Sequence, residues 1–114
     1  MTPGEIEAHC LSLPAATLSV QWGGASVFKV GGKIFALTGG VFEGLAFKAS
    51  DMAFELLPEQ GLARPAPYLY RAKWLQVREL EAFGADATRA YLTQAHALVV
   101  ARLTRRARAD LGLG

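Results

Sequence analysis

Three side chains in this sequence could do nucleophilic or metal chemistry, namely the thiol of Cys10 and the imidazoles of His9 and His96. A catalytic thiol needs a base within hydrogen-bond reach. His9 and Cys10 are adjacent in a segment predicted to be helical, where neighbouring side chains diverge by roughly 100° and so cannot pair. We therefore expect Cys10 to be a small buried hydrophobe and His9 to be a surface residue.

His96 has no acidic residue three or four positions away, so a structural or solvent-facing histidine is the better interpretation. A metal site needs several convergent ligands, which two isolated histidines do not supply. The glycine doublets at 23–24, 31–32 and 39–40 lie between predicted strands, and no Lys-Ser/Thr pair follows them as in a phosphate-binding loop. We predict turns there, no catalytic residues, no cofactor and no metal, and hence a protein that is not an enzyme.

Basic residues give the more informative pattern. From Arg102 onward there are four arginines and one acid, a net charge of +3, whereas the remaining residues carry eight basic and nine acidic groups, a net of −1. A local basic patch can attract phosphate. Cations in the last turns of a helix also stabilise its negative end without any partner, so both interpretations stay open for these arginines. The basic residues at this terminus are Arg102, Arg105, Arg106 and Arg108.

Length and composition indicate one domain. The chain has 114 residues, just over half of them hydrophobic, which is enough for a single core. One cysteine excludes an intrachain disulfide. The first residues carry acid where a signal peptide carries base, and no apolar run is long enough to cross a bilayer. We expect a cytoplasmic protein with no membrane association and a single domain over residues 1–114.

The predicted fold class is α+β, a two-layer arrangement in which helices pack on an antiparallel sheet made of a meander and a later strand. The expected element order is α-β-β-β-β-α-β-α. Thr2 and Ser50 are expected to cap the first two helices. Within the second helix, Met52, Leu56 and Phe54 are expected to face inward. The predicted helices are 3–13, 50–57 and 85–111, and the predicted strands are 17–22, 26–30, 33–38, 41–48 and 74–78.

Two tight Gly-Gly hairpins would fix the register of the meander. Val30 would then oppose Lys33, Phe28 would oppose Phe35, and Leu37 would oppose Phe42. This register places Lys33 and Lys48 on one face, with Lys29 on the reverse. Neither face is cleanly polar, so either both faces are partly covered or one turn is wider than assumed.

Aromatic residues beside lysines on a β-ribbon could stack on bases while the ammonium groups contact phosphate. The competing interpretation is that these aromatic residues are core and that the lysines lie at its rim. The favoured hypothesis is a weak nucleic-acid-binding protein in which phosphate contacts come from the sheet and from the C-terminus. The residues proposed for these contacts are Lys29, Lys33, Lys48, Arg102, Arg105, Arg106 and Arg108.

Several stretches read together resemble the MmcQ/YjbR family over essentially the whole chain. They are Cys10-Leu11-Ser12-Leu13-Pro14, the segment 27–37 (VFKVGGKIFAL), Leu45-Ala46-Phe47-Lys48, Ala66-Pro67-Tyr68-Leu69, Lys73-Trp74-Leu75-Gln76-Val77 and Ala101-Arg102-Leu103. The resemblance implies a small monomeric α+β domain, and DNA as the partner because the family's sheet looks like the "double wing" of a phage transcription factor. Positions that match the family motif are Lys33, Phe35, Lys48 and Trp74.

The turn at Gly39-Gly40 is shorter than in many members of that family, which gives it less reach into a groove. An alternative function is a protein- or peptide-interaction module on the segment Arg64–Trp74, where prolines hold Tyr68, Tyr70 and Trp74 near one another. That segment could instead be a packed loop that seals the edge of the sheet.

Overall fold

The first helix, α1 (Pro3–Ser12), begins as its sequence predicts, in a computed structural model that describes residues 1–40 and 42–114. The Thr2 hydroxyl accepts a hydrogen bond from the Glu5 amide, and the Glu5 carboxylate accepts one from the Thr2 amide. This capping box satisfies two amides that the helix itself leaves unpaired. The helix turns Ile6 and Cys10 into the core, where both are fully buried.

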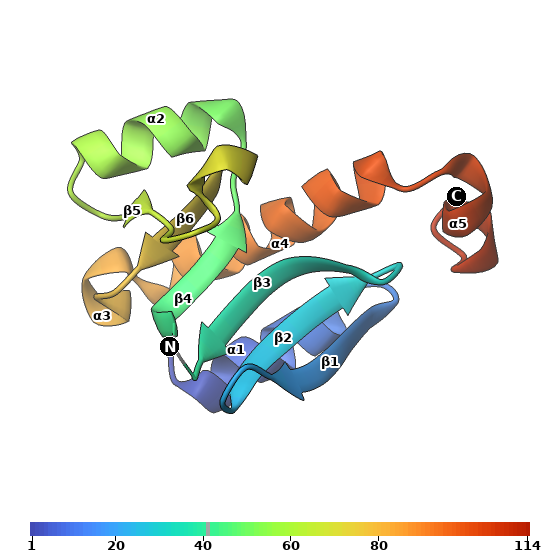
Figure 1. The fold of residues 1–114 in the computed structure, drawn as a ribbon, viewed down its shortest axis with the longest axis horizontal. Coiled ribbons are helices and arrows are strands. Elements are labelled where there is room, and N and C mark those ends of the chain that lie inside the picture. Colours follow the sequence, from blue (N-terminus) through green and yellow to red (C-terminus); the bar gives the residue numbers. More distant parts are fainter. Residues whose placement is uncertain (41) are drawn as a thin grey trace.

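In the described residues, six strands form one antiparallel sheet in the order β1-β2-β3-β4-β6-β5 (Figure 1). The first four are consecutive in the chain, which confirms the meander, and β6 adds to β4 as the later strand. The α+β class and the element order are therefore confirmed. The structure also contains three short elements that were not predicted: a two-residue edge strand, a 3-10 turn and the helix α3. The strands are β1 (Ala16–Gln21), β2 (Ala25–Val30), β3 (Lys33–Gly39), β4 (Phe42–Lys48), β5 (Arg64–Pro65) and β6 (Trp74–Val77).

A β-bulge shifts the register between β2 and β3. Val30 opposes Lys33 across the glycine turn, as predicted. Phe28, however, opposes Ala36 rather than Phe35, so that part of the predicted register is wrong. Phe35 is the extra residue in β3, and its ring is fully buried. A bulge adds one residue to one strand only, which strict alternation cannot anticipate.

A second β-bulge shifts the register between β3 and β4, and Gly39, predicted to lie in the turn, pairs with Phe42. Leu37 opposes Ala46 and not Phe42, so the predicted pairing is wrong here too. The extra residues lie in β4, where Gly44 has a φ of 69°, a conformation that favours glycine. The predicted start of this strand at Val41 lies outside the described residues.

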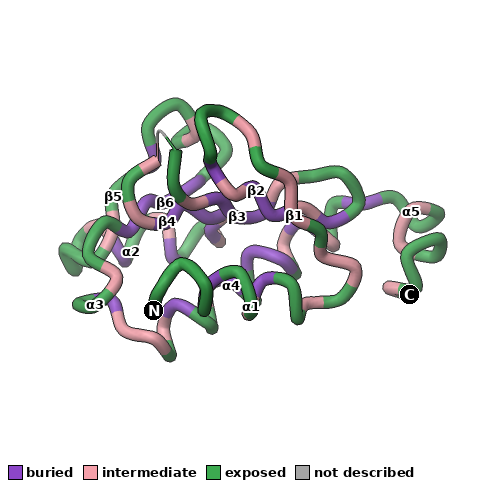
Figure 2. Tube along the Cα trace, turned by 90° about the horizontal axis from the view of Figure 1, so that it is seen from below, coloured by how far each residue is buried: buried purple, intermediate pink, exposed green. Residues whose placement is uncertain are grey.

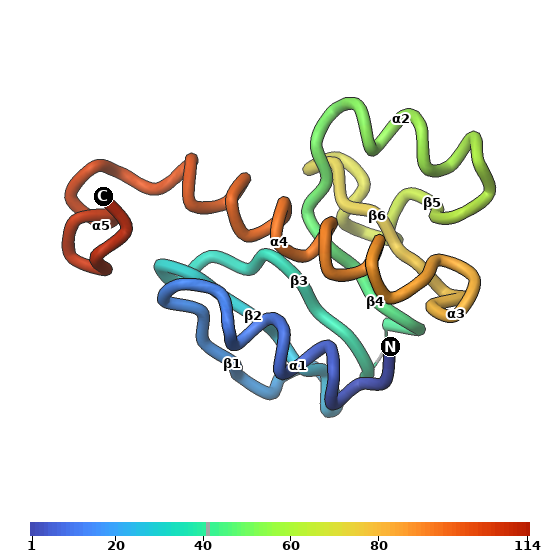
Figure 3. Tube along the Cα trace, turned by 180° about the vertical axis from the view of Figure 1, so that it is seen from behind, coloured from blue at the N-terminus to red at the C-terminus, as the bar shows by residue number. Residues whose placement is uncertain are grey.

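Both faces of the sheet carry buried side chains, but the helices of the described chain cover one face far more than the other. On the helix face, α1 and α4 (Ala85–Arg102) lie across the strands (Figure 3). Loops cover the opposite, open face (Figure 2), and it has a smaller apolar cluster of its own. That cluster contains Ala25, Val27, Leu37, Ala46, Ala66 and Trp74. The 3-10 turn η1 (Tyr70–Ala72) and α3 (Leu80–Phe83) flank β6.

The second helix, α2 (Asp51–Glu59), presents a different stripe to the core from the one predicted. Ser50 caps it as expected, through a hydrogen bond from the Ala53 amide. Ala53 and Leu57 are the buried residues, whereas Met52 and Leu56 are 70% and 44% exposed. The prediction that Met52 and Leu56 face inward is therefore wrong. Both stripes have i, i+4 spacing, so periodicity alone did not distinguish them.

The last predicted helix is not continuous. α4 ends at Arg102, and a second helix, α5 (Arg105–Asp110), starts after Thr104, whose hydroxyl accepts a hydrogen bond from the Ala107 amide. Leu103 between them has an extended backbone and is buried. Its side chain lies against Gly31 in the β2–β3 turn, where a methyl group on the glycine would come within 2.8 Å of it. The chain breaks the helix here because Leu103 docks into the core.

Gly44→Ala is expected to destabilise the fold much more than Gly61→Ala. Both glycines have positive φ, 69° and 73°, so alanine introduces backbone strain of roughly 1–2 kcal/mol at either position. A Cβ at Gly44 would also lie 2.1 Å from the Val77 carbonyl oxygen, whereas nothing lies within 4 Å at Gly61. Urea denaturation should show an additional loss of about 1–3 kcal/mol for Gly44→Ala. Equal losses would contradict the close approach of β4 and β6.

Candidate nucleic-acid interface

The sheet lysines divide between the two faces differently from the prediction. Lys29 and Lys48 oppose residues that pack in the apolar cluster of the open face. Lys33 opposes Val30, which belongs to the helix-face core. The predicted grouping of Lys33 with Lys48, and of Lys29 on the reverse, is therefore wrong. The extra residues in β3 and β4 change the face on which every later side chain lies.

Strand direction nevertheless brings the basic residues to one end of the molecule. The β2–β3 turn and the C-terminus of β4 lie at the same end of the sheet, because neighbouring strands are antiparallel. α4 runs toward this end and α5 follows beyond it (Figure 1). We refer to this region as the basic end, and it consists of Lys29, Lys33, Lys48, Arg102, Arg105, Arg106 and Arg108.

Lys48 and Arg102 line one cleft of about 410 Å³, although they are 54 positions apart in the sequence. Lys48 donates a hydrogen bond to the carbonyl oxygen of Ala72. Partial burial lowers the pKa of the Lys48 ammonium, and the charges of Arg102 and Lys73 lower it further. These cations therefore repel one another at this end, a situation that a bound anion would relieve.

One carboxylate lies in the same cleft. Asp51 pairs with Lys73, whose Nζ is 2.6 Å from Oδ1, and this hydrogen bond and charge lower the pKa of the carboxyl group. Within residues 1–40 and 42–114, none of the arginines of the basic end forms an ion pair. Arg102, Arg105 and Arg106 are also exposed, so their guanidinium groups are accessible to an external anion.

The aromatic residues of the 64–74 segment do not form one exposed group. Tyr68 is 91% exposed and Tyr70 is 50% exposed, with the Arg71 guanidinium 6.0 Å from the Tyr70 ring centroid. Trp74 is buried under this segment. Together with Tyr68 it lines an apolar pocket of about 380 Å³ on the open face. The segment thus covers part of the sheet and also exposes two tyrosines.

Sequence reasoning missed two residues of that pocket, Trp22 and Phe42. Their rings meet edge to face with centroids 6.4 Å apart, although they come from different turns. The available signal was an aromatic residue close to two of the three glycine doublets, since Trp22 precedes Gly23-Gly24 and Phe42 follows soon after Gly39-Gly40. Two turns at the same end of a meander place such residues together.

The two histidines considered as possible catalytic or metal-binding residues form hydrogen bonds within the fold. The Nε2 atom of His96 lies 2.8 Å from the Pro14 carbonyl oxygen, and its ring packs edge-on against Phe35. His9 is partly exposed and hydrogen-bonds Thr93. No group of three or more metal-ligating residues occurs in the described part of the chain. Among those same residues, no helix combines the length and the apolar character needed to cross a bilayer.

These features define a small α+β domain with a single antiparallel sheet, one helix-covered face and a basic end. A family model described as YjbR matches residues 11–98. The chain therefore belongs to the YjbR family, as the resemblance predicted. The match includes the sheet lysines and the apolar pocket, whereas Arg102 and the arginines of α5 lie beyond it. No curated protein is significantly similar to the chain.

The Cys10 thiol is expected to be inert in the folded protein. Burial raises its pKa to about 12, so the reactive thiolate is scarce at neutral and mildly alkaline pH. Iodoacetamide should therefore modify Cys10 only at the rate at which the protein opens, and rapidly in urea. Fast, complete labelling under native conditions would show that α1 does not hold this residue in the core.

Proposed function

We propose that this YjbR-family domain binds nucleic acid weakly and with little sequence preference, through phosphate contacts at its basic end. The observation that carries the proposal is the convergence of antiparallel strands and α4, which brings Lys33, Lys48 and Arg102 to one end of the molecule. Contacts from lysine and arginine to phosphate fix position and supply affinity, but they carry no sequence information.

Arg102 is the strongest single candidate for a phosphate contact. It is exposed, it lines the cleft that it shares with Lys48, and a guanidinium can hold two phosphate oxygens at once. Lys48 contributes mainly as a charge, since its ammonium already donates to a backbone carbonyl. Lys33 at the β2–β3 turn and the arginines of α5 extend the positive surface, since Leu103 before α5 packs against Gly31 of that turn.

Base stacking on the ribbon is not part of this proposal. Phe28 and Phe35 are fully buried in the helix-face core, so these two rings are not available to bases. The exposed side chains that define the basic end are cationic. We therefore expect duplex and single-stranded nucleic acid to compete for the same surface, with affinities that fall steeply as salt increases.

A charge-matched pair of variants tests this proposal. Arg105→Gln/Arg106→Gln removes two charges from the basic end, and Arg78→Gln/Arg89→Gln removes two exposed charges at the opposite end of the sheet and of α4. Fluorescence anisotropy with labelled duplex and single-stranded oligonucleotides should show binding that weakens with salt. For duplex, the slope of log K against log salt should shrink by roughly 0.9 for each phosphate that the variant no longer neutralises.

The control pair should keep the wild-type slope, because its net charge changes equally but at a different place. Two results would each remove the proposal. One is no binding by the wild-type protein at low salt and high protein concentration. The other is the same reduction in slope for both pairs, which would indicate attraction by net charge rather than a surface at the basic end.

A further inference from the structure

The open face contains an apolar pocket of about 380 Å³ between the sheet and the 64–74 segment. Leu37 and Trp74 come from strands of the sheet, and Trp22 and Tyr68 are more exposed residues at its opening. The other side chains that line it are apolar as well. The volume falls in the range of roughly 300–1,000 Å³ that small-molecule sites occupy, and such sites are mostly apolar with a few polar groups.

Backbone strain presents two aromatic side chains of this pocket. Trp22 and Tyr68 have φ values of 46° and 68°, in the left-handed region that bulky residues rarely adopt. Each such residue costs on the order of 1–3 kcal/mol and persists only where the surrounding structure holds it. Both rings are nevertheless substantially exposed, at 50% and 91%. Two large aromatic residues thus lie exposed beside the pocket on backbone conformations that such residues rarely adopt.

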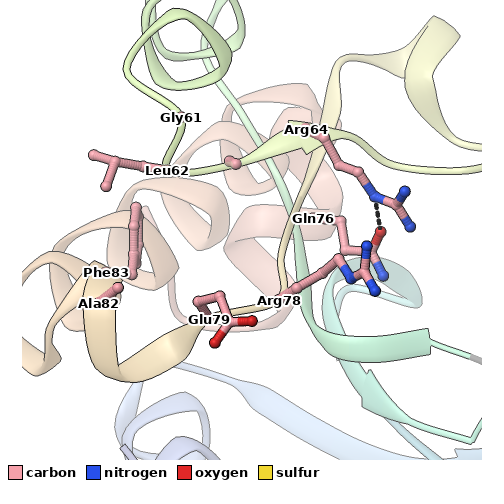
Figure 4. A pocket seen from close by; sticks show the side chains of 9 residues that line it. Gly61, Leu62, Arg64, Gln76, Arg78, Glu79, Ala82 and Phe83 are labelled. Atoms are coloured by element: carbon pink, nitrogen blue, oxygen red, sulfur yellow. Dashed lines mark hydrogen bonds between the residues drawn. The ribbon is translucent and has the colours of Figure 1, made fainter.

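Two arginines lie directly beside the apolar pocket. Arg64 and Arg78 line an adjoining cleft of about 480 Å³, and that cleft shares Phe42 and Tyr68 with the apolar pocket. They also line the pocket drawn in Figure 4, where both side chains lie next to the amide of Gln76. A small ligand with its apolar part in this pocket could therefore place an anionic group against a guanidinium group of the adjoining cleft.

A buried amide orients one of these arginines. Gln76 is only 4% exposed, and its Oε1 accepts a hydrogen bond from Arg64 Nε at 2.8 Å (Figure 4). Its Nε2 donates to the Glu43 carbonyl oxygen at 2.9 Å, which fixes the amide in turn. Because Nε is used, the two terminal nitrogens of Arg64 remain to bind an anion in the forked geometry that suits a carboxylate or sulfonate.

The charges around this group leave Arg64 available. Arg78 pairs with the Glu43 carboxylate, with Nη2 and Oε2 3.0 Å apart. Arg64 forms no ion pair with any acidic residue in the described ranges. The cleft that adjoins the apolar pocket is lined by Glu43, which pairs with Arg78, and not by Glu79, which lines the pocket of Figure 4. The charges of these side chains therefore favour the binding of one anionic group at Arg64.

We infer that the open face binds a small aromatic anion, with its ring system in the apolar pocket and its carboxylate or sulfonate on Arg64. Charge complementarity identifies this occupant, because Arg64 lies in the cleft that adjoins the apolar pocket and its terminal nitrogens form no ion pair with a described acidic residue. The aromatic lining from Trp22, Phe42 and Tyr68 suits flat rings, which prefer offset or edge contacts with such residues. The site lies outside the basic end and does not rest on the proposed function.

Two dyes with the same rings test the two halves of this site separately. Anilinonaphthalene sulfonate carries an anionic group, and phenylnaphthylamine is the same ring system without it. Fluorescence titration of the full chain should give one saturable site for the sulfonate. Arg64→Gln should weaken sulfonate binding by about tenfold and leave phenylnaphthylamine binding unchanged. Trp22→Ala should weaken the binding of both dyes.

Arg71→Gln is the matched control, since Arg71 is an exposed arginine of the same segment that lines none of these pockets. It should bind both dyes like the wild type, and thermal denaturation should show every variant to be folded. Sulfonate binding that Arg64→Gln or Trp22→Ala leaves unaltered would overturn the assignment. So would displacement of the dye by an oligonucleotide or by a protein partner, either of which would make this face part of a macromolecular surface.

Discussion

The sheet carries apolar side chains on both faces, while the helices of the described chain cover mainly one of them. The other face must therefore be covered by other segments, and the rest of the structure depends on this constraint. In β3 and β4, three consecutive residues are buried, at 35–37 and at 45–47. Successive side chains of a strand point to opposite faces, so such runs require cover on both sides. On the open face that cover is the 64–74 segment. It buries Trp74 and Ala66 but leaves the apolar pocket beside them.

The same constraint explains why the basic end is assembled as it is. α4 must stay on the helix face to bury Leu92, Ala95 and Val99, so its direction is set by the core. Leu103 completes that core by packing against the β2–β3 turn, and it breaks the helix in doing so. The arginines of α5 are therefore placed by apolar contacts, because Ala107 of α5 and Leu113 after it pack against the same core as Leu103.

Local structure could be predicted from the sequence where one or two residues determine it. Thr2 and Ser50 cap their helices as expected, and the glycine turn after Val30 sets the pairing with Lys33. The register beyond that turn could not be predicted, because the residues around Phe35 are apolar without alternation and fit either face. The break at Leu103 has no proline or glycine to mark it. It results from a tertiary contact that overrides helix propensity.

The candidate site was predictable to a similar degree. The lysines and arginines can be read from the sequence, but the face of the sheet on which each lysine lies depends on the β-bulges. Because of the bulges, Lys29 rather than Lys33 shares the open face with Lys48. The residues of the apolar pocket come from separate segments that only the folded sheet brings together. Arg64 and Gln76 carried no signal in the sequence, since their relationship is a cross-strand pair between β5 and β6.

The hydrogen bond between Gln76 and Arg64 marks a physical difference between the site on the open face and the basic end. A buried amide is costly unless its polar atoms are hydrogen-bonded, and here its partners are a backbone carbonyl and the Arg64 guanidinium. Satisfying Gln76 therefore fixes the arginine in one orientation. At the basic end, by contrast, Arg102, Arg105 and Arg106 are exposed, and no such contact to a described residue holds them. A cation that a hydrogen bond holds in one orientation suits one small ligand of defined shape. Cations without such a contact suit a polyanion whose phosphates need no single geometry.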